Sequence, residues 1–193
     1  MNIGQQIKLI ISDFDGTLVD TFKANYLSYN QAFKEVGLTL SENTYRNCFG
    51  LRFDEFMSNM NIFDENTKNT IKKLKHDLYP NYFDYLVPNK TLFSLITAFH
   101  NSGGKTALAS TASRQNLLSA VNCFSTTDIF DIIISGEDVK KGKPSPEIFL
   151  TILSKLEINK SETIIFEDSI TGINAARKAG INYIKVNNIF YEN

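Results

Sequence analysis

Five short aliphatic runs, each bounded by polar or turn-forming residues, recur along this chain of 193 residues. They are IKLIIS (7–12), KTALAS (105–110), DIIIS (131–135), TIIFE (163–167) and NYIKV (182–186). Because apolar residues occupy consecutive rather than alternating positions, each run is typical of a strand that is buried on both faces. Such strands occur in parallel sheets covered by helices, so the runs predict an α/β fold.

From residue 90 onward, the segments between these runs have the spacing of amphipathic helices. Apolar residues recur at intervals of three and four over 92–99, 117–124 and 148–156. Gly180 follows a periodic segment, where a helix commonly ends, and Pro146 suits the first turn of a helix. We therefore expect strands and helices to alternate, with helices on both faces of the sheet.

The first aliphatic run is followed by roughly 90 residues before the next one, against a few tens for an ordinary crossover. This stretch contains three helical faces that are rich in aromatic residues, which can give a small insert its own core. The faces are Phe22, Tyr26, Tyr29, Phe33 and Val36; Phe53, Phe56, Met57 and Met60; and Ile71, Leu74 and Leu78. Asp20 with Thr21 can begin the first of these helices as a cap. We predict a core domain of residues 1–16 and 88–193 and an inserted helical domain of residues 17–87.

The net charge, the N-terminal segment and the cysteines indicate which partners and which cellular compartment to expect. With 20 basic and 21 acidic side chains, the net charge of -1 attracts neither nucleic acid nor an anionic membrane. The N-terminal apolar run is broken by Asp13 and is too short for a signal or a membrane span, so we expect a cytoplasmic protein. Cys48 and Cys123 are expected to be buried free thiols. The basic runs KKLKH and KKGK are interpreted as solvated faces, and either a monomer or a weak homodimer is expected.

Polar side chains gather where the expected strands end, and the carboxyl ends of parallel strands share one edge of a sheet. These residues are Asp13 and Asp15, Ser110 and Thr111, Lys143 in the loop after the third run, and Glu167 and Asp168. Two carboxylates about 4 Å apart repel by about 4 kcal/mol at an effective dielectric constant near 20, so we expect a divalent cation among them. Oxygen donors without a nearby histidine or cysteine favour Mg²⁺.

This set of residues has the chemistry of phosphoryl transfer. A carboxylate with a reference pKa near 4 is ionised at neutral pH, so Asp13 is a candidate nucleophile that needs no base. Asp15 is a candidate acid and base for the leaving group and for water. Lys143, Ser110 and the amides that follow Ser110 would bind phosphate oxygens.

The segment DFDGTLVDT (13–21) resembles the first motif of the haloacid dehalogenase superfamily of phosphohydrolases. Three further motifs of that superfamily follow in order as LASTASR (108–114), GKPSPEIF (142–149) and FEDSITGINAARKAG (166–180). The resemblance spans residues 7–186 and points to the phosphoglycolate phosphatase and β-phosphoglucomutase-like subfamily. The insert lies where members of this subfamily carry a helical cap.

The resemblance implies a Rossmann-like core and a Mg²⁺ ion held by Asp13, Asp168 and the main-chain oxygen of Asp15. Glu167 would be an additional ligand or lie just behind the ligands. An aspartyl-phosphate intermediate on Asp13 is also implied, with Lys143 and Ser110 binding the phosphate.

Leaving-group specificity in this family belongs to the cap. The segment FGLRFDEFM (49–57) resembles the cap loop that enters the active site, so Gly50, Leu51 and Arg52 are candidate substrate contacts. Arg52 could instead be a solvent-exposed arginine at a helix start. Thr111 and Asn25 are further candidate contacts.

We predict a Mg²⁺-dependent phosphatase for a small phosphorylated metabolite. A phosphoglucomutase-type phosphotransferase is the nearest alternative, and Asn25 disfavours it because such members carry a histidine at that place. A non-catalytic module that binds a phosphate ligand is the other alternative. Phosphoglycolate, sugar phosphates, glycerol phosphate and nucleoside monophosphates all stay open as substrates.

Overall fold

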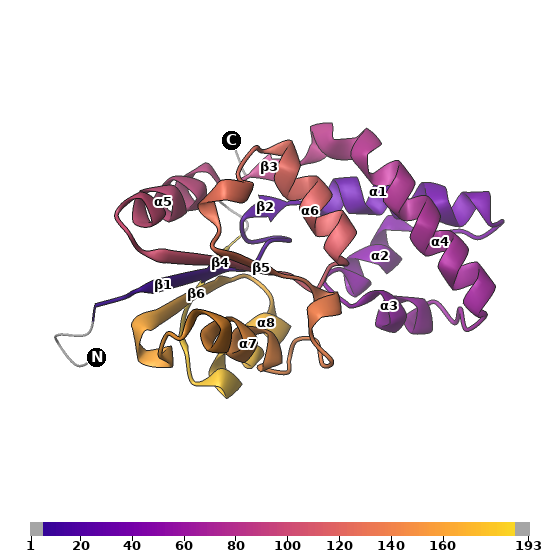
Figure 1. Cartoon of the computed structure of the whole chain (residues 1–193). Coiled ribbons are helices and arrows are strands. Elements are labelled where there is room, and N and C mark those ends of the chain that lie inside the picture. The colour runs from indigo at the N-terminus through magenta and orange to yellow at the C-terminus, as the bar shows by residue number, and fades with distance from the viewer. Residues whose placement is uncertain (1–5, 188–193) are drawn as a thin grey trace.

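The computed structural model describes residues 6–187, and a five-stranded parallel sheet lies at its centre (Figure 1). The strands are β1 (Leu9–Ser12), β4 (Lys105–Ala109), β5 (Ile132–Ile134), β6 (Thr163–Glu167) and β7 (Asn182–Lys185). Their order in the sheet is β5-β4-β1-β6-β7, and every neighbouring pair is parallel. Each strand falls within one of the five aliphatic runs, so the predicted α/β fold is confirmed.

Two pairs of helices cover the two faces of this sheet (Figure 1). They are α5 (Lys90–Asn101) and α6 (Arg114–Cys123) on one face, and α7 (Glu147–Leu156) and α8 (Ile170–Ala179) on the other. Successive residues of β1 point to opposite faces, because side chains alternate along a strand. Ile10 packs in the cluster that contains residues of α5 and α6, whereas Leu9 and Ile11 pack with residues of α7 and α8. This explains why β1 is apolar at consecutive positions.

The strand register decides which polar residues meet at the edge. Ser12, the last residue of β1, lies opposite Leu108 of β4 and Phe166 of β6. The residues that follow these three are Asp13, Ala109 and Glu167. Parts of the chain that are about 100 and 150 residues apart in sequence therefore meet at one edge of the sheet.

The inserted segment is helical. It contains α1 (Phe22–Glu35), α2 (Glu42–Cys48), α3 (Phe53–Asn59), α4 (Glu65–Leu78) and the 3₁₀ helix η1 (Tyr79–Tyr85). A separate hydrophobic cluster joins α1, α2, α3 and α4, with Phe33, Met57 and Ile71 fully buried in it, whereas Tyr79 of η1 packs in the cluster that contains residues of α5 and α6. Helix α2 was not predicted, because its sequence ENTYRNC has too few apolar residues to show a helical period. Shorter 3₁₀ turns elsewhere are η2 (Thr127–Ile129), η3 (Gly136–Asp138) and η4 (Lys160–Glu162).

Two short strands join the points where the chain enters and leaves this helical segment. Strands β2 (Val19–Asp20) and β3 (Val87–Pro88) pair in antiparallel fashion, with Val19 opposite Pro88. The pair lies close to the domain boundaries predicted after residues 16 and 87. The boundaries themselves stay a prediction, and we refer to residues 17–87 as the cap on that basis.

The two cysteines differ in their exposure to solvent. Cys48 is buried, as expected, but Cys123 is exposed, so the prediction of two buried thiols was wrong for Cys123. Cys123 ends α6, and its neighbour Phe124 provides the aromatic contact to the core instead. Among residues 6–187, no helix combines the length and the apolar content that crossing a bilayer requires.

Candidate active site

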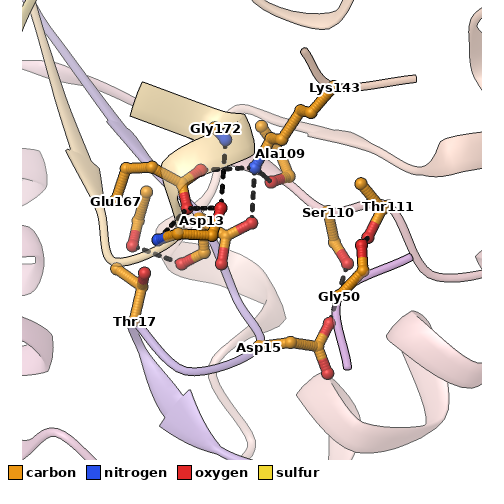
Figure 2. Close-up of polar contacts among 12 residues, drawn as sticks. Asp13, Asp15, Thr17, Gly50, Ala109, Ser110, Thr111, Lys143, Glu167 and Gly172 are labelled. Carbon is orange, nitrogen blue, oxygen red and sulfur yellow. Dashed lines mark hydrogen bonds and ion pairs between the residues drawn. The ribbon is translucent and has the colours of Figure 1, made fainter. Parts of the chain in front are cut away.

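Lys143 joins two buried carboxylates at the edge of the sheet. Its Nζ atom lies 2.5 Å from Oδ1 of Asp13 and 2.6 Å from Oε2 of Glu167, and it donates to the main-chain oxygen of Ala109 at 3.1 Å (Figure 2). Burial by itself lowers the pKa of Lys143, but the two carboxylates together outweigh it and hold that pKa above its ordinary value. The lysine is therefore charged, and it compensates part of the negative charge at this edge.

Glu167 is fully buried, and both of its carboxylate oxygens are engaged. Oε2 faces Lys143, while Oε1 accepts hydrogen bonds from the amide and the hydroxyl of Ser169 at 3.0 and 2.8 Å. Helix α8 packs directly on this carboxylate: a Cβ atom at Gly172 would come within 1.9 Å of Oε2. Position 172 therefore has no room for a side chain, and Glu167 is held where it can orient Lys143.

Three carboxylates converge beside Lys143. Oxygen atoms of Asp13, Glu167 and Asp168 lie within 4.8 Å of one another. Burial, and then the charge of Glu167, raise the pKa of Asp13 well above its ordinary value and that of Asp168 to about 6. One lysine therefore does not balance the group. An additional hard cation would balance it, and the all-oxygen donor set fits a divalent ion of the magnesium type.

Gly16 and Thr17 hold Asp168 close to Asp13. The hydroxyl of Thr17 donates to Oδ1 of Asp168 at 2.8 Å. Gly16 has φ of +90°, a conformation that favours glycine, and a Cβ atom there would lie 2.4 Å from Oδ2 of Asp168. The glycine of the DFDG stretch thus allows both the turn after Asp15 and the close approach of Asp168.

The side chain of Asp15 lies apart from this group and contacts a different set of donors (Figure 2). Oδ1 accepts from the hydroxyl of Thr21 at 2.6 Å and from Nδ2 of Asn25 at 3.4 Å. Oδ2 accepts from the buried hydroxyl of Ser110 at 2.9 Å. Asp15 therefore connects the cap, through Thr21 and Asn25, with the end of β4.

The contact of Thr21 corrects one expectation. We expected Asp20 and Thr21 to begin the next helix as its cap, and Oδ1 of Asp20 does accept from the amide of Phe22 at 2.9 Å. Thr21, however, makes no side-chain capping bond, because its hydroxyl points to Asp15. Asp20 and Thr21 are the part of the sequence that could have indicated the contact with Asp15, but we interpreted these two residues only as a helix cap.

A cavity of ≈ 70 Å³ lies between Asp15 and the cap. Four predicted substrate contacts line it, namely Asn25, Gly50, Leu51 and Thr111. Thr111 also donates to the main-chain oxygen of Gly50 at 3.1 Å, which joins the core loop to the cap loop (Figure 2). The other lining residues are Tyr29, Tyr45, Phe49, Phe53, Lys72, Lys75, Ala112, Ser113 and Asn116. Arg52 lines a separate cleft beside Glu137.

Lys75 is a lining residue that we did not anticipate. It belongs to the KKLKH run, and the interpretation of that run as a solvated face was wrong for this position, where the side chain is 3% exposed. Its Nζ atom lies 3.6 Å from the ring centroid of Tyr79 and 5.3 Å from that of Tyr29. Lys75 follows the buried Ile71 by four residues, so helical spacing contained the signal for its burial.

Burial lowers the pKa of Lys75 to about 7 from an ordinary value of 10.5, although the charge of Asp15 acts in the opposite direction. No ion-pair partner for Lys75 occurs within residues 6–187. The aromatic faces of Tyr29 and Tyr79 therefore provide the main local stabilisation of the ammonium. Such an amine is available to a ligand in the cavity.

Replacing Lys75 by methionine is expected to stabilise the protein at neutral pH. The folded state binds this proton more weakly than the unfolded chain, so the penalty for Lys75 is largest below pH 7 and disappears as pH rises through 10.5. The cation–π contacts offset part of it, and we expect Lys75→Met to gain on the order of 2 kcal/mol at pH 7. Urea unfolding of both proteins between pH 6 and pH 10 measures the difference.

Lys34→Met is the matched control, because Lys34 is an exposed lysine on cap helix α1. It should change the free energy of unfolding by less than about 0.5 kcal/mol at every pH. A Lys75→Met protein that is less stable than the parent at pH 7, or a difference that does not shrink toward pH 10, would contradict a buried amine without a charged partner.

The chain is similar to known proteins over most of its length. A family model described as haloacid dehalogenase-like hydrolase matches residues 10–186. The phosphorylated carbohydrates phosphatase of Thermotoga maritima is 28% identical over 184 residues, which span 92% of this chain and 84% of the relative. The beta-phosphoglucomutase of Bacillus subtilis is 26% identical, over 91% of this chain and 81% of the relative. The structure of CbbY from Rhodobacter sphaeroides in complex with phosphate aligns with a TM-score of 0.85 at 24% identity, over 97% of this chain and 89% of that one.

Proposed function

This chain belongs to the haloacid dehalogenase-like hydrolases, and we propose that it is a Mg²⁺-dependent phosphatase for a small phosphate monoester. The observation that supports this most directly is the buried ion pair between Lys143 and Asp13 at 2.5 Å, beside two further carboxylates. One carboxylate would suffice to balance a purely structural lysine, whereas Lys143 pairs with two. Phosphatase names among the relatives support the same class of reaction.

In the proposed reaction, Asp13 is the nucleophile. Lys143 holds Oδ1 of Asp13, and no hydrogen bond reaches Oδ2 from residues 6–187, so Oδ2 is the atom that attacks phosphorus. A bond forms between that oxygen and phosphorus while the ester bond to the leaving alkoxide breaks. The product of this step is an aspartyl phosphate on Asp13 and a leaving group that needs a proton.

Asp15 moves the protons in both halves of the reaction. Its carboxyl lines the cavity in which the leaving group would lie, so it gives a proton to the departing alkoxide. It then takes a proton from the water that attacks the aspartyl phosphate, and this second attack releases inorganic phosphate and restores Asp13. Thr21 and Ser110 orient Asp15 through hydrogen bonds to its two oxygens.

Asp13, Asp168 and the main-chain oxygen of Asp15 would hold Mg²⁺ in this proposal. When bound, the ion neutralises charge on the carboxylates and on the phosphate oxygens. Both oxygens of Glu167 are already engaged by Lys143 and Ser169, so we assign Glu167 to positioning Lys143 rather than to direct ligation. Lys143 and the amides that follow Ser110 bind the phosphate oxygens.

The cavity indicates the kind of leaving group. Donors from Asn25 and Lys75 and the rings of Tyr29 and Tyr45 line a small space, which suits a short leaving group with hydroxyl or acidic substituents. The Thermotoga maritima relative named as a phosphorylated carbohydrates phosphatase supports a sugar phosphate as the first class to test. Gly50, Leu51 and Thr111 would close the cavity from the cap loop and the core loop.

A phosphoglucomutase-type activity is the alternative that the relatives raise. At the position where we expect a histidine in such enzymes, Nδ2 of Asn25 lies 3.4 Å from Oδ1 of Asp15. An amide does not titrate near neutral pH, so it does not supply the proton chemistry of a histidine. Conversion of a hexose 1-phosphate into its 6-phosphate without release of phosphate would favour the mutase over the phosphatase.

Phosphate release from a panel of phosphate esters tests the proposal. The panel should contain sugar phosphates, phosphoglycolate, glycerol phosphate and nucleoside monophosphates. We expect turnover with Mg²⁺, loss of at least about 100-fold after chelation with EDTA, and recovery when Mg²⁺ is restored, because the buried carboxylates then lack a cation.

Two results of this assay would count against the proposal. Turnover that is unaffected by EDTA would exclude a metal-dependent reaction. If no ester in the panel is hydrolysed, while isothermal titration shows that the protein binds inorganic phosphate, the non-catalytic binding module becomes the better interpretation.

A further inference from the structure

Arg52, a candidate substrate contact on the basis of the sequence, reaches across to the core instead. Its Nη2 atom donates to the main-chain oxygen of Gly136 at 2.7 Å, and Nη1 donates to that of Lys140 at 3.1 Å. The hydrocarbon part of the side chain lies against Gly142, where a Cβ atom would come 2.5 Å from Cδ of Arg52. One arginine of the cap is thus fastened at three points to a single loop of the core.

That loop also carries Lys143. Its far end is anchored at the start of α7, where Glu147 accepts hydrogen bonds from the amides of Lys140 and Lys141 at 2.8 and 3.0 Å. Lys143 follows directly after Gly142, the residue that Arg52 covers. The position of Arg52 therefore affects the backbone next to the lysine that binds Asp13.

Other contacts between cap and core are weaker or lie elsewhere. Lys72 pairs with Glu137 at 3.0 Å, but both side chains are about half exposed, and such pairs contribute little. Thr111 contacts the main-chain oxygen of Gly50 through one hydroxyl. The planar fork of an arginine can bridge two carbonyl oxygens at once, which the single ammonium of a lysine does less well.

We infer that Arg52 is a positioning residue that fastens the closed cap to the loop 136–143 and thereby places Lys143 beside Asp13. Closure of the cap and assembly of the phosphate-binding lysine are then one event. Arg52 would not recognise the substrate, because both of its Nη atoms bond to main-chain oxygens of the core loop and it lines the cleft beside Glu137 rather than the cavity above Asp15. The kinetic part of this inference rests on the proposed phosphatase activity, whereas the closure of the cap does not.

Closure can be measured without any substrate. Cys123 is exposed on the core, and Phe63 in the cap is 67% exposed, so spin labels on Cys123 and on Phe63→Cys report the distance between the two parts. Cys48 is buried, and burial raises the pKa of its thiol, which protects it from labelling. The parent should give one narrow distance distribution, and Arg52→Lys should give a broader one that extends to longer distances.

Arg46→Lys is the matched control, because Arg46 is an exposed cap arginine that pairs with Glu42 inside the cap. Its distance distribution should equal that of the parent. If Arg52→Lys also leaves the distribution unchanged, Arg52 does not fasten the cap and the inference is wrong. Melting temperatures within a few degrees of the parent, recorded for every variant, show that a broader distribution is not caused by unfolding.

Kinetics separate positioning from substrate recognition. For Arg52→Lys we expect kcat/KM to fall about tenfold, and by the same factor for p-nitrophenyl phosphate and for a sugar bisphosphate. A loss confined to the bisphosphate would instead assign Arg52 to a second anionic group of the substrate and overturn the inference. If the parent hydrolyses no ester, the proposed function fails, and the distance measurement alone still decides whether Arg52 fastens the cap.

Discussion

Asp13→Asn is expected to lower phosphate release by at least about 1,000-fold, because an amide oxygen does not attack phosphorus as a carboxylate does. The substitution keeps the shape of the side chain, so Lys143 can still contact the remaining oxygen. It also removes one of the three converging carboxylates and so reduces the negative charge at this edge of the sheet. The measurement is steady-state phosphate release with Mg²⁺, using the best ester of the panel.

Asp20→Asn is the matched control for this prediction. Asp20 lies in the same motif, but its carboxylate accepts a hydrogen bond from the amide of Phe22 at the start of α1. Asparagine is also a good helix cap, so this variant should keep its activity within about twofold of the parent. Equal turnover by the parent and Asp13→Asn would show that Asp13 is not the nucleophile or that a contaminating phosphatase is being measured.

Lys143→Met is expected to have the largest effect on stability. The change leaves Asp13 and Glu167 without the ammonium that lies 2.5 and 2.6 Å from them, in a region where both carboxylates are buried. Breaking a buried ion pair by removing one partner typically costs about 3–5 kcal/mol. Urea unfolding in the presence of EDTA measures this cost without a contribution from bound metal. Phosphate release should also fall by at least about 100-fold, because the phosphate loses a charged donor.

A second substitution distinguishes lost pairing from lost packing. In Lys143→Met/Glu167→Gln one of the two orphaned carboxylates becomes neutral, so we expect the double variant to be more stable than Lys143→Met alone by about 1–3 kcal/mol. Lys155→Met, at an exposed position on α7, should change stability by less than about 0.5 kcal/mol. A double variant that is less stable than Lys143→Met would mean that the volume of the lysine, not its charge, holds this part of the core.

The strands and the residues at their ends could be predicted because local patterns determine them. An apolar run that is buried on both faces has to lie inside a parallel sheet, and the parallel arrangement brings the ends of β1, β4 and β6 to one edge. The convergence of Asp13, Glu167 and Asp168 follows from that geometry. Helix α2 and the exposure of Cys123 were missed, because each depends on a short or terminal segment with little periodicity.

The contacts of individual side chains in the cap were much less accessible to prediction. Lys75 has a helical position that puts it on the face of Ile71, but only the docking of α4 over Asp15 turns that face into the wall of a cavity. The sequence around Thr21 is typical of a helix cap, but in the folded protein the Thr21 hydroxyl donates to Asp15. In both cases the local pattern predicts the position of the residue in or beside a helix, but not which side chain it contacts.

The sequence by itself determined the parallel sheet, the order of the motifs and the set of carboxylates beside a lysine, because strand periodicity and strand ends are local properties. Only the tertiary structure decided which cap side chains meet the core. Arg52 and its partner Gly136 are 84 residues apart, and their contact depends on how the cap is rotated against the sheet. That rotation results from many weak contacts summed over two surfaces, and no short segment of the chain encodes it.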